Sequence, residues 1–177
     1  MNYTIVSDEV LYTNEPVTRV SRDDIQVLKT LALRNSRRRI RLCAHPGVGD
    51  GLHEMIIVHA GGTYIRPHKH VGKSESFHII EGRFQVVLFE EDGRIRDVVN
   101  LGHTESGANF YYRLSESWFH TVIPMSEVVV FHETTNGPFR PEDAVFAPWA
   151  PQENDHEGQK RYLDQLRVRQ AERFPGG

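Results

Sequence analysis

Two histidines and a glutamate in the middle of the chain have a spacing that suits a metal ion. His68 and His70 are two residues apart, so in an extended segment both side chains lie on one face. Glu75 begins the next strand-like run and shares its face with Phe77 and Ile79. A carboxylate on an apolar, inward face is unfavourable unless it is paired or bound to a metal. The pattern therefore predicts ligands that converge in the interior.

A fourth ligand should come from a later strand. His120 lies in the strand-like run 118–124, where its alternation partners Trp118 and Val122 are apolar. This places the imidazole on an inward face as well. Three imidazoles and one carboxylate suit Fe, Mn, Zn, Ni or Co as a divalent ion and leave room for water or substrate. We predict one such transition metal, held by His68, His70, Glu75 and His120.

Nearby polar and aromatic residues are candidates for binding a substrate or moving a proton. Arg66 could hold a carboxylate or phosphate with its planar fork, and a surface ion pair suits it equally; for Lys73 the ion pair is the simpler interpretation. His59 is either an acid or base or a buried structural residue, and one of His132 and Glu133 must face inward. The substrate-binding candidates are Arg66, Tyr64, Lys73 and Trp118, and the catalytic candidates are His59 and Glu133.

The elements that must position these residues are short strands. Residues 51–136 contain about seven or eight β-rich runs with turns at regular spacing and no helical stretch between them. This pattern predicts an all-β domain, an antiparallel barrel or jelly roll, rather than a parallel α/β sheet. Asp92-Gly93 between two of the runs predicts a hairpin with a type I′ turn.

Helices should flank the strands. Ser21 can cap a helix over residues 21–36, with Asp23 and Asp24 in its first turn and Ile25, Leu28, Leu31 and Leu33 at near-helical spacing. A second helix is predicted over residues 159–174, ended by Pro175-Gly176-Gly177. We expect one domain in three parts: an N-terminal arm with a helix and a basic strand (1–50), the barrel (51–136), and a Pro-rich segment with a C-terminal helix as a cap (137–177).

Composition and charge limit the class of protein and the kinds of partner that this chain can have. Hydrophobic residues make up 38% of the chain and charged residues 25%, which excludes a disordered chain, and no run of about 18 apolar residues could span a bilayer. The net charge of -3 argues against a nucleic-acid binder. Arg37 to Arg41 form a solvated edge or an anion-binding patch near a pocket. The single cysteine, Cys43, and the lack of a signal-like start predict a cytoplasmic protein. His45, in a turn-rich break, should contact solvent.

The segment from Gly62 to Gly82 matches the first motif of the cupin superfamily without a mismatch: Gly, five residues, His-x-His, four residues, Glu, six residues, Gly. The second motif is degenerate, since His120 is kept but Ser115, Ser117 and Pro124 replace its Pro, Gly and Asn. Over about residues 37 to 167 the sequence resembles the WbuC family of cupin-fold metalloproteins, most clearly in Tyr64–His70, Trp118–His120, Asn136–Phe139 and Phe146–Pro151.

This resemblance implies a cupin double-stranded β-helix with one metal centre, and a homodimer. It also implies a role in bacterial surface-polysaccharide (O-antigen) biosynthesis. Metal-assisted isomerisation or epimerisation of a sugar or sugar nucleotide is then the favoured reaction. The alternatives are an Fe(II)-dependent dioxygenase and a non-catalytic protein that binds a metal and a small ligand. In each case the expected partner is a small molecule, a sugar or an anion, with neither nucleic acid nor membrane.

Overall fold

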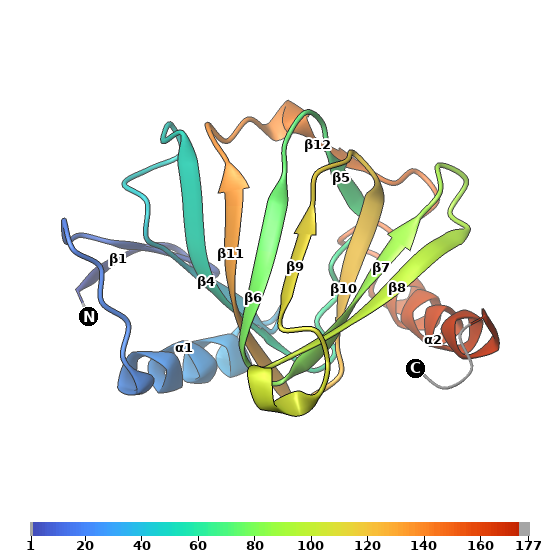
Figure 1. Ribbon diagram of the computed structural model, residues 1–177, viewed down its shortest axis with the longest axis horizontal. Helices are drawn as coiled ribbons and strands as arrows, with labels where there is room; N and C mark the ends of the chain where they lie inside the picture. The colour runs from blue at the N-terminus through green and yellow to red at the C-terminus, as the bar shows by residue number, and fades with distance from the viewer. Residues whose placement is uncertain (1, 174–177) are drawn as a thin grey trace.

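The structure is a computed structural model that describes residues 2–173, and it consists of two β-sheets with two helices (Figure 1). The Pro175-Gly176-Gly177 stop predicted for the second helix lies outside the described residues. The larger sheet contains β1 (Tyr3–Ser7), β2 (Val10–Thr13), β3 (Arg39–Cys43), β4 (Leu52–Ala60), β6 (Glu75–Glu81), β9 (Tyr111–Leu114) and β11 (Val128–Asn136). The smaller sheet contains β5 (His68–His70), β7 (Arg83–Phe89), β8 (Ile95–Gly102), β10 (Phe119–Pro124) and β12 (Ala144–Phe146). The helices are α1 (Arg22–Arg34) and α2 (His156–Arg173), and two 3-10 turns are η1 (Thr104–Ser106) and η2 (Pro141–Asp143).

The strand order is that of a jelly roll. The larger sheet runs β1-β2-β3-β4-β11-β6-β9 and the smaller β12-β5-β10-β7-β8. Within these, β4-β11-β6-β9 faces β5-β10-β7-β8, which is the eight-strand, two-sheet arrangement of a jelly roll. The all-β prediction is confirmed at this level. One pairing departs from the antiparallel pattern, since β2 and β3 are parallel. The hairpin β1–β2 was not predicted, because its strands are short and its residues are mostly exposed or half-buried.

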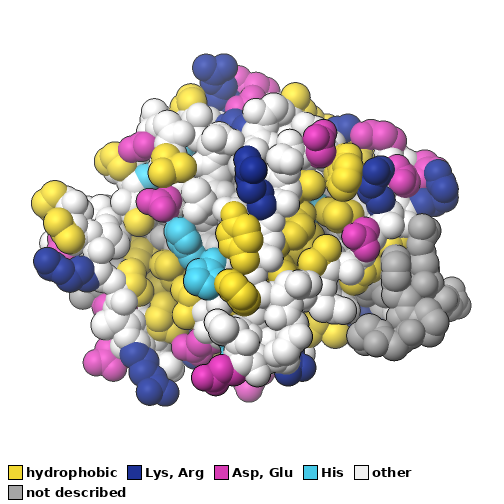
Figure 2. All heavy atoms as spheres, in the orientation of Figure 1, with side chains coloured by type: hydrophobic (Ala, Val, Ile, Leu, Met, Phe, Trp, Pro, Cys, Tyr) yellow, Lys and Arg dark blue, Asp and Glu magenta, His cyan; other side chains and the backbone are white. Residues whose placement is uncertain are grey.

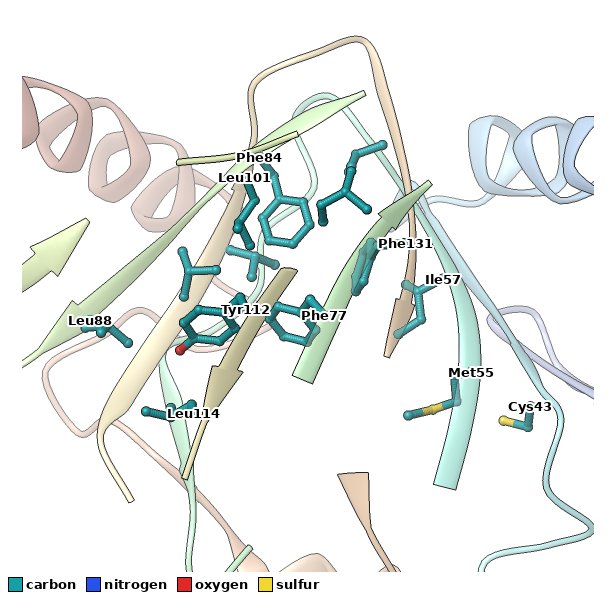
Figure 3. Packing of buried hydrophobic residues seen from close by; sticks show 14 residues of the cluster. Cys43, Met55, Ile57, Phe77, Phe84, Leu88, Leu101, Tyr112, Leu114 and Phe131 are labelled. Atoms are coloured by element: carbon teal, nitrogen blue, oxygen red, sulfur yellow. The ribbon is translucent and has the colours of Figure 1, made fainter. Parts of the chain in front are cut away.

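The main core lies between the sheets. Figure 3 shows three phenylalanine rings that meet there, one from each of β6, β7 and β11. Phe77 lies 5.7 Å from Phe84 and 5.3 Å from Phe131 between ring centroids, and Phe84 lies 5.0 Å from Phe131. Phe77 is on the same strand as Glu75 and two residues from it, so this packing fixes the strand that carries the predicted carboxylate ligand.

Each helix covers the outer face of one sheet. Ser21 caps α1 as predicted, and Asp24 completes a capping box with it. The buried residues of α1 pack against Ile40, Val58 and other outward side chains of β3, β4 and β11. Leu33 was predicted to lie on the buried face of the helix, but it is 43% exposed. Ala32 is buried there instead. Helix α2 packs through Leu166 against the outer side of the smaller sheet. No helix within residues 2–173 is long and apolar enough to cross a bilayer.

Two turns have glycines whose backbone other residues rarely adopt. Gly82, which ends the motif and joins β6 to β7, has φ +78°, and a Cβ there would collide with the backbone carbonyl of Val128. The hairpin after β7 is closed by a bond from the Gly93 N–H to the Glu90 carbonyl. Gly93 has φ +82°, but Asp92 does not have a positive φ. The turn is therefore a type I turn followed by a left-handed glycine, and the type I′ prediction is wrong.

Candidate metal centre

Three imidazoles come together from two neighbouring strands of the smaller sheet. His68 and His70 are the ends of β5, and His120 on β10 is paired with His68 in register. One ring nitrogen from each of the three lies within 4.8 Å of the others. Glu75, the first residue of β6 in the larger sheet, approaches two of them. The structure thus brings together the four predicted ligands from three strands.

Backbone carbonyls orient two of the imidazoles. His68 Nδ1 lies 2.9 Å from the carbonyl oxygen of Arg66, and His120 Nδ1 lies 3.1 Å from that of Trp118. A carbonyl oxygen can only accept, so in both rings Nδ1–H donates and Nε2 is the nitrogen with a free lone pair. Such a bond to the far ring nitrogen is the usual way in which a protein fixes the tautomer of a metal-binding histidine.

The Glu75 carboxylate is buried beside these rings. Its side chain is 4% exposed, with Oε1 2.9 Å from His120 Nε2 and Oε2 3.4 Å from His70 Nε2. No well-aligned hydrogen bond reaches Oε1, so the short approach to His120 is a contact between charges. A buried carboxylate oxygen without an aligned donor requires a positive charge nearby.

The protonation states agree with a site built for a cation. Burial, reinforced by the neighbouring imidazoles of His120 and His70, lowers the pKa of His68 to about 3, which keeps it in the neutral, metal-binding form. Burial also opposes protonation of His120, but the charge and hydrogen bonding of Glu75, together with the Trp118 carbonyl and the charge of Glu133, outweigh it and raise the pKa of His120. Burial alone would raise the pKa of Glu75, whereas His120 and His70 hold it well below 4.5. A divalent ion at the three nitrogens would supply the positive charge in place of the proton, so the residues fit a divalent transition metal.

The three imidazoles line a cavity of about 550 Å³ between the sheets. This volume is in the range of small-molecule sites, about 300–1,000 Å³. Its lining also includes apolar side chains such as Ile57 and Phe131, and Arg41, which is exposed. The cavity is therefore connected to solvent, and the predicted metal centre lies in its wall.

Three of the predicted catalytic and substrate-binding residues line the same cavity. His59 on β4 is buried, and its Nδ1 has no hydrogen-bond partner. Arg66 precedes the histidine pair, and its Nε is buried and also without a partner. Glu133 on β11 lines the cavity as well, and it interacts electrostatically with Glu75 and with Arg41. Burial, and then the charge of Glu75, raise the pKa of Glu133 to about 7.

The choice between His132 and Glu133 is settled by strand alternation. His132 is paired in register with His78 on β6, and its Nε2 lies 3.8 Å from Glu54 Oε1 on the outer side of the sheet. Figure 2 shows histidine side chains at the surface over β11 and β6. Glu133, the next residue, therefore points inward.

The other three substrate-binding candidates lie elsewhere. The Tyr64 hydroxyl donates to the carbonyl of Pro151 at 2.8 Å, and the ring lines a second cavity beside α2. Lys73 forms an ion pair with Asp143 at 2.9 Å, the simpler of the two interpretations. Trp118 packs against the core, with the Arg96 guanidinium 3.8 Å from its ring centroid. None of the three lines the cavity that contains the histidines.

One wall of the cavity was not predicted from the sequence. The Pro-rich segment supplies Phe139, Pro141, Ala144 and Phe146, because β12 pairs with β5 and places Phe146 opposite His68. The aromatic residues in this Pro-rich stretch were the only sequence signal. The basic run, for which two interpretations were open, contributes Arg37, Arg39 and Arg41 to the same cavity.

A second histidine cluster corrects another expectation. His45 was predicted to contact solvent, but it is only 5% exposed. Its ring stacks on that of His53, with centroids 4.0 Å apart, and its Nδ1 contacts the backbone of Glu54. Cys43, two residues earlier, is buried as predicted.

His59 should make the metal-free protein sensitive to acid. Burial, and then the charge of Arg39, lower its pKa from 6.5 to about 3. Between these values the unfolded chain binds more protons, so stability falls as the pH falls, by about 1.4 kcal/mol per pH unit for one such group. From pH 6.5 to pH 4.5, the His59→Leu variant should lose about 2–3 kcal/mol less unfolding free energy than the wild type. Urea titrations with a chelator present measure this, and equal losses in the two proteins would show that His59 is not the group involved.

Comparisons with known proteins give a family of undefined function and distant structural neighbours. A domain of unknown function (DUF6016) matches residues 20–101, which is less than half of the chain. Among curated proteins nothing matches. Protein SO0799 from Shewanella oneidensis aligns at 9% identity and TM-score 0.48, over 58% of this chain and 66% of that one.

Two further structures align less well. Oxalate decarboxylase from Bacillus subtilis, in a study of its Mn(II) centres, aligns at 19% identity and TM-score 0.43 over 55% of this chain. The Cnp3 cupin domain of Schizosaccharomyces pombe aligns at 10% identity and TM-score 0.44, over 56% of this chain and 64% of that one. The chain spans only 24% of the oxalate decarboxylase chain. Because these TM-scores are all below 0.5, the alignments do not support a particular function, and the geometry of the site is the basis for one.

Proposed function

We propose that this chain is a metal-binding cupin protein that acts on a sugar or sugar nucleotide by metal-assisted isomerisation or epimerisation. The observation that carries the proposal is the cluster of His68, His70 and His120, with the buried Glu75 carboxylate beside it, in the wall of an open cavity. These residues would hold one divalent transition metal. When bound, the metal supplies a Lewis acid that polarises a carbonyl or hydroxyl group.

The sugar part of the proposal rests on the resemblance to the WbuC family. The matching residues include Tyr64–His70 and Phe146–Pro151, which lie next to each other because β5 and β12 are paired. Part of each segment lines the cavity, namely Arg66, His68 and His70 from the first and Phe146 from the second. A cavity of about 550 Å³ has room for a sugar and not for a large polymer.

Glu133 is the group best suited to move a proton. It points into the cavity, and burial together with the charge of Glu75 raises its pKa to about 7, so both protonation states are populated near neutral pH. His59, whose pKa burial lowers to about 3, stays neutral there. As a neutral imidazole in the cavity wall, it can instead help to hold a hydroxyl group of the substrate in position. The two residues predicted as catalytic thus have different roles.

One alternative has a specific observation in its favour. Three imidazoles and a carboxylate are also a donor set that suits Fe(II), which makes a dioxygenase-type cupin the second candidate. The metal content of protein purified without a chelating tag separates the two candidates. The presence of Glu133 and His59 in the cavity argues against a protein that only stores a metal or small ligand.

The proposed reaction predicts exchange of a carbon-bound proton with solvent. Metal-loaded protein in D₂O should place deuterium next to the carbonyl of at least one member of a panel of hexose phosphates, which can open to the aldehyde or ketone, and nucleotide-linked 4-keto-hexoses, as read by mass spectrometry. Glu133→Gln should lower this rate by about 100-fold or more, because it removes the proton-transfer group. The metal content should stay the same.

His132→Gln is the matched control, since it changes the neighbouring residue on the outer face and should leave the rate unchanged. Wild type stripped of metal should incorporate no deuterium. A stripped protein that keeps its rate would exclude the metal-assisted reaction, and no incorporation into any hexose of the panel would argue for the alternative candidates.

A further inference from the structure

Arginines are concentrated in the wall of the cavity, and half of them already have carboxylate partners. Arg37 contacts Glu9 at 3.0 Å and Glu153 at 2.6 Å, and the Nε of Arg39 contacts the other Glu9 oxygen at 2.7 Å. Glu9 and Glu153 thus neutralise these two side chains. The arginines that line the cavity are Arg37, Arg39, Arg41 and Arg66. Arg41 and Arg66 remain without a carboxylate among the described residues.

Arg66 is held in place with a donor left over. One of its Nη atoms donates to the carbonyl of Ala147 at 3.1 Å, and its guanidinium lies 5.1 Å from the ring centroid of Phe146. Its Nε is buried and has no hydrogen-bond partner. Its other Nη atom also has no hydrogen-bond partner among the described residues, and the side chain lines the cavity two residues from His68. This Nη is therefore the donor that a ligand in the cavity can reach.

Arg41 lines the same cavity. It is two residues from Arg39 on β3, so both side chains share the inward face, and it is exposed. No ion pair or hydrogen bond occupies its guanidinium within residues 2–173. Glu133 interacts with it electrostatically but forms no ion pair with it among the described residues.

We infer that Arg41 and Arg66 bind a negatively charged group of the substrate, a phosphate or a carboxylate, while another part of the substrate reaches the three imidazoles. An arginine offers such oxyanions paired, charge-assisted donors. The substrate class is then a sugar phosphate, sugar nucleotide or sugar acid rather than a neutral sugar. The inference rests on the proposed function for the position of the reacting end, but the anion subsite depends only on the arginines.

Three small probes of the same carbon skeleton test the charge requirement on the wild type. Ligand-observed NMR titration of Zn²⁺-loaded protein with glycerol, glycerate and glycerol 3-phosphate should show at least one acid bound about ten-fold or more tightly than glycerol. Which acid binds better identifies the source of the charge, carboxylate or phosphate. Equal binding of glycerol and both acids would overturn the inference, whether or not any variant folds.

Variants locate the subsite. Arg41→Gln and Arg66→Gln should each weaken the preferred acid about ten-fold and leave the metal content at one per chain. The carbonyl that orients His68 belongs to the Arg66 backbone and survives the substitution. Arg66→Lys keeps the charge and loses the planar fork, so it should fall between Arg66→Gln and wild type. Arg94→Gln is the matched control, because this exposed arginine pairs with Asp92 on the distant hairpin.

The outcomes separate the two proposals. Protein that binds metal, with the same acid affinity in wild type and in both Gln variants, contradicts the anion subsite and leaves the proposed metal centre intact. Protein that binds no metal but prefers the acid, and loses this preference in the variants, supports the subsite and contradicts the proposed function.

Discussion

His120→Ala should deprive the protein of its divalent metal. The Nε2 of His120 is one of three ring nitrogens within 4.8 Å of one another, and the residue is 2% exposed, so no solvent-exposed group can replace it. Loss of an outer hydrogen-bond partner of a metal ligand lowers affinity by about 10–100-fold, and loss of the ligand itself should exceed this. We expect less than about one tenth of the wild-type metal content after purification, and an affinity in chelator competition lowered by more than about 100-fold.

His132→Ala is the control for a missing imidazole. His132 is half-buried on the outer face of β11, with Glu54 beside it, and has no part in the cavity. The His132→Ala variant should contain as much metal as the wild type. Substoichiometric metal in both variants would indicate a general loss of folded protein, which circular dichroism detects. Full metal content in folded His120→Ala would show that the three imidazoles are not the ligand set.

The convergence of the four candidate ligands could be predicted because these residues obey local rules. The His-x-His pair and the glutamate are within eight positions of one another, and two-residue alternation decides which face each side chain occupies. The same rule placed His120 inward, between the apolar residues Trp118 and Val122. The helix α1 was predictable for a similar reason, since Ser21 and Asp24 form a capping box over a single turn.

The rule of two-residue alternation failed where the chain does not form a strand. Residues 62–67 have no strand structure, and both Ile65 and Arg66 line the cavity although they are consecutive. Alternation from His68 back to Tyr64 therefore carries no information, and the Tyr64 hydroxyl binds the carbonyl of Pro151 instead. The placement of Tyr64 depends on contacts with a segment about 90 residues away, which no local pattern contains.

The remaining wall of the cavity depends on pairings between distant parts of the chain. Arg39 reaches it because β3 pairs with β4 in a register that sets Arg39 opposite His59. Phe146 reaches it because the three-residue strand β12 pairs with β5. Strands this short have too little periodicity to be predicted. The charge run and the aromatic residues are visible in the sequence, but only the sheet order shows that they surround one cavity.

Phe84→Ala should destabilise the protein by about 3–5 kcal/mol, the usual loss for a fully buried phenylalanine. Phe84 is 1% exposed and packs against Phe77 and Phe131 between the two sheets (Figure 3). Truncation removes apolar contacts from both sheets and leaves a void, because strands held by hydrogen bonds on both edges cannot close around it. Phe110→Ala, at a position that is 47% exposed, should lose no more than about 1 kcal/mol.

Phe84→Ala also tests whether the packing of the core, as distinct from the ligands themselves, controls metal binding. Phe84 does not line the cavity, so folded Phe84→Ala should bind metal with nearly wild-type affinity. Stability must be compared by urea unfolding with a chelator present, since a bound ligand at 100 times its Kd adds about 2.7 kcal/mol and would mask the loss. If metal affinity fell as far in Phe84→Ala as in His120→Ala, the packing of Phe77 beneath Glu75 would control the site as strongly as a ligand does. A stability loss below about 1 kcal/mol would instead mean that the two sheets do not meet at this ring.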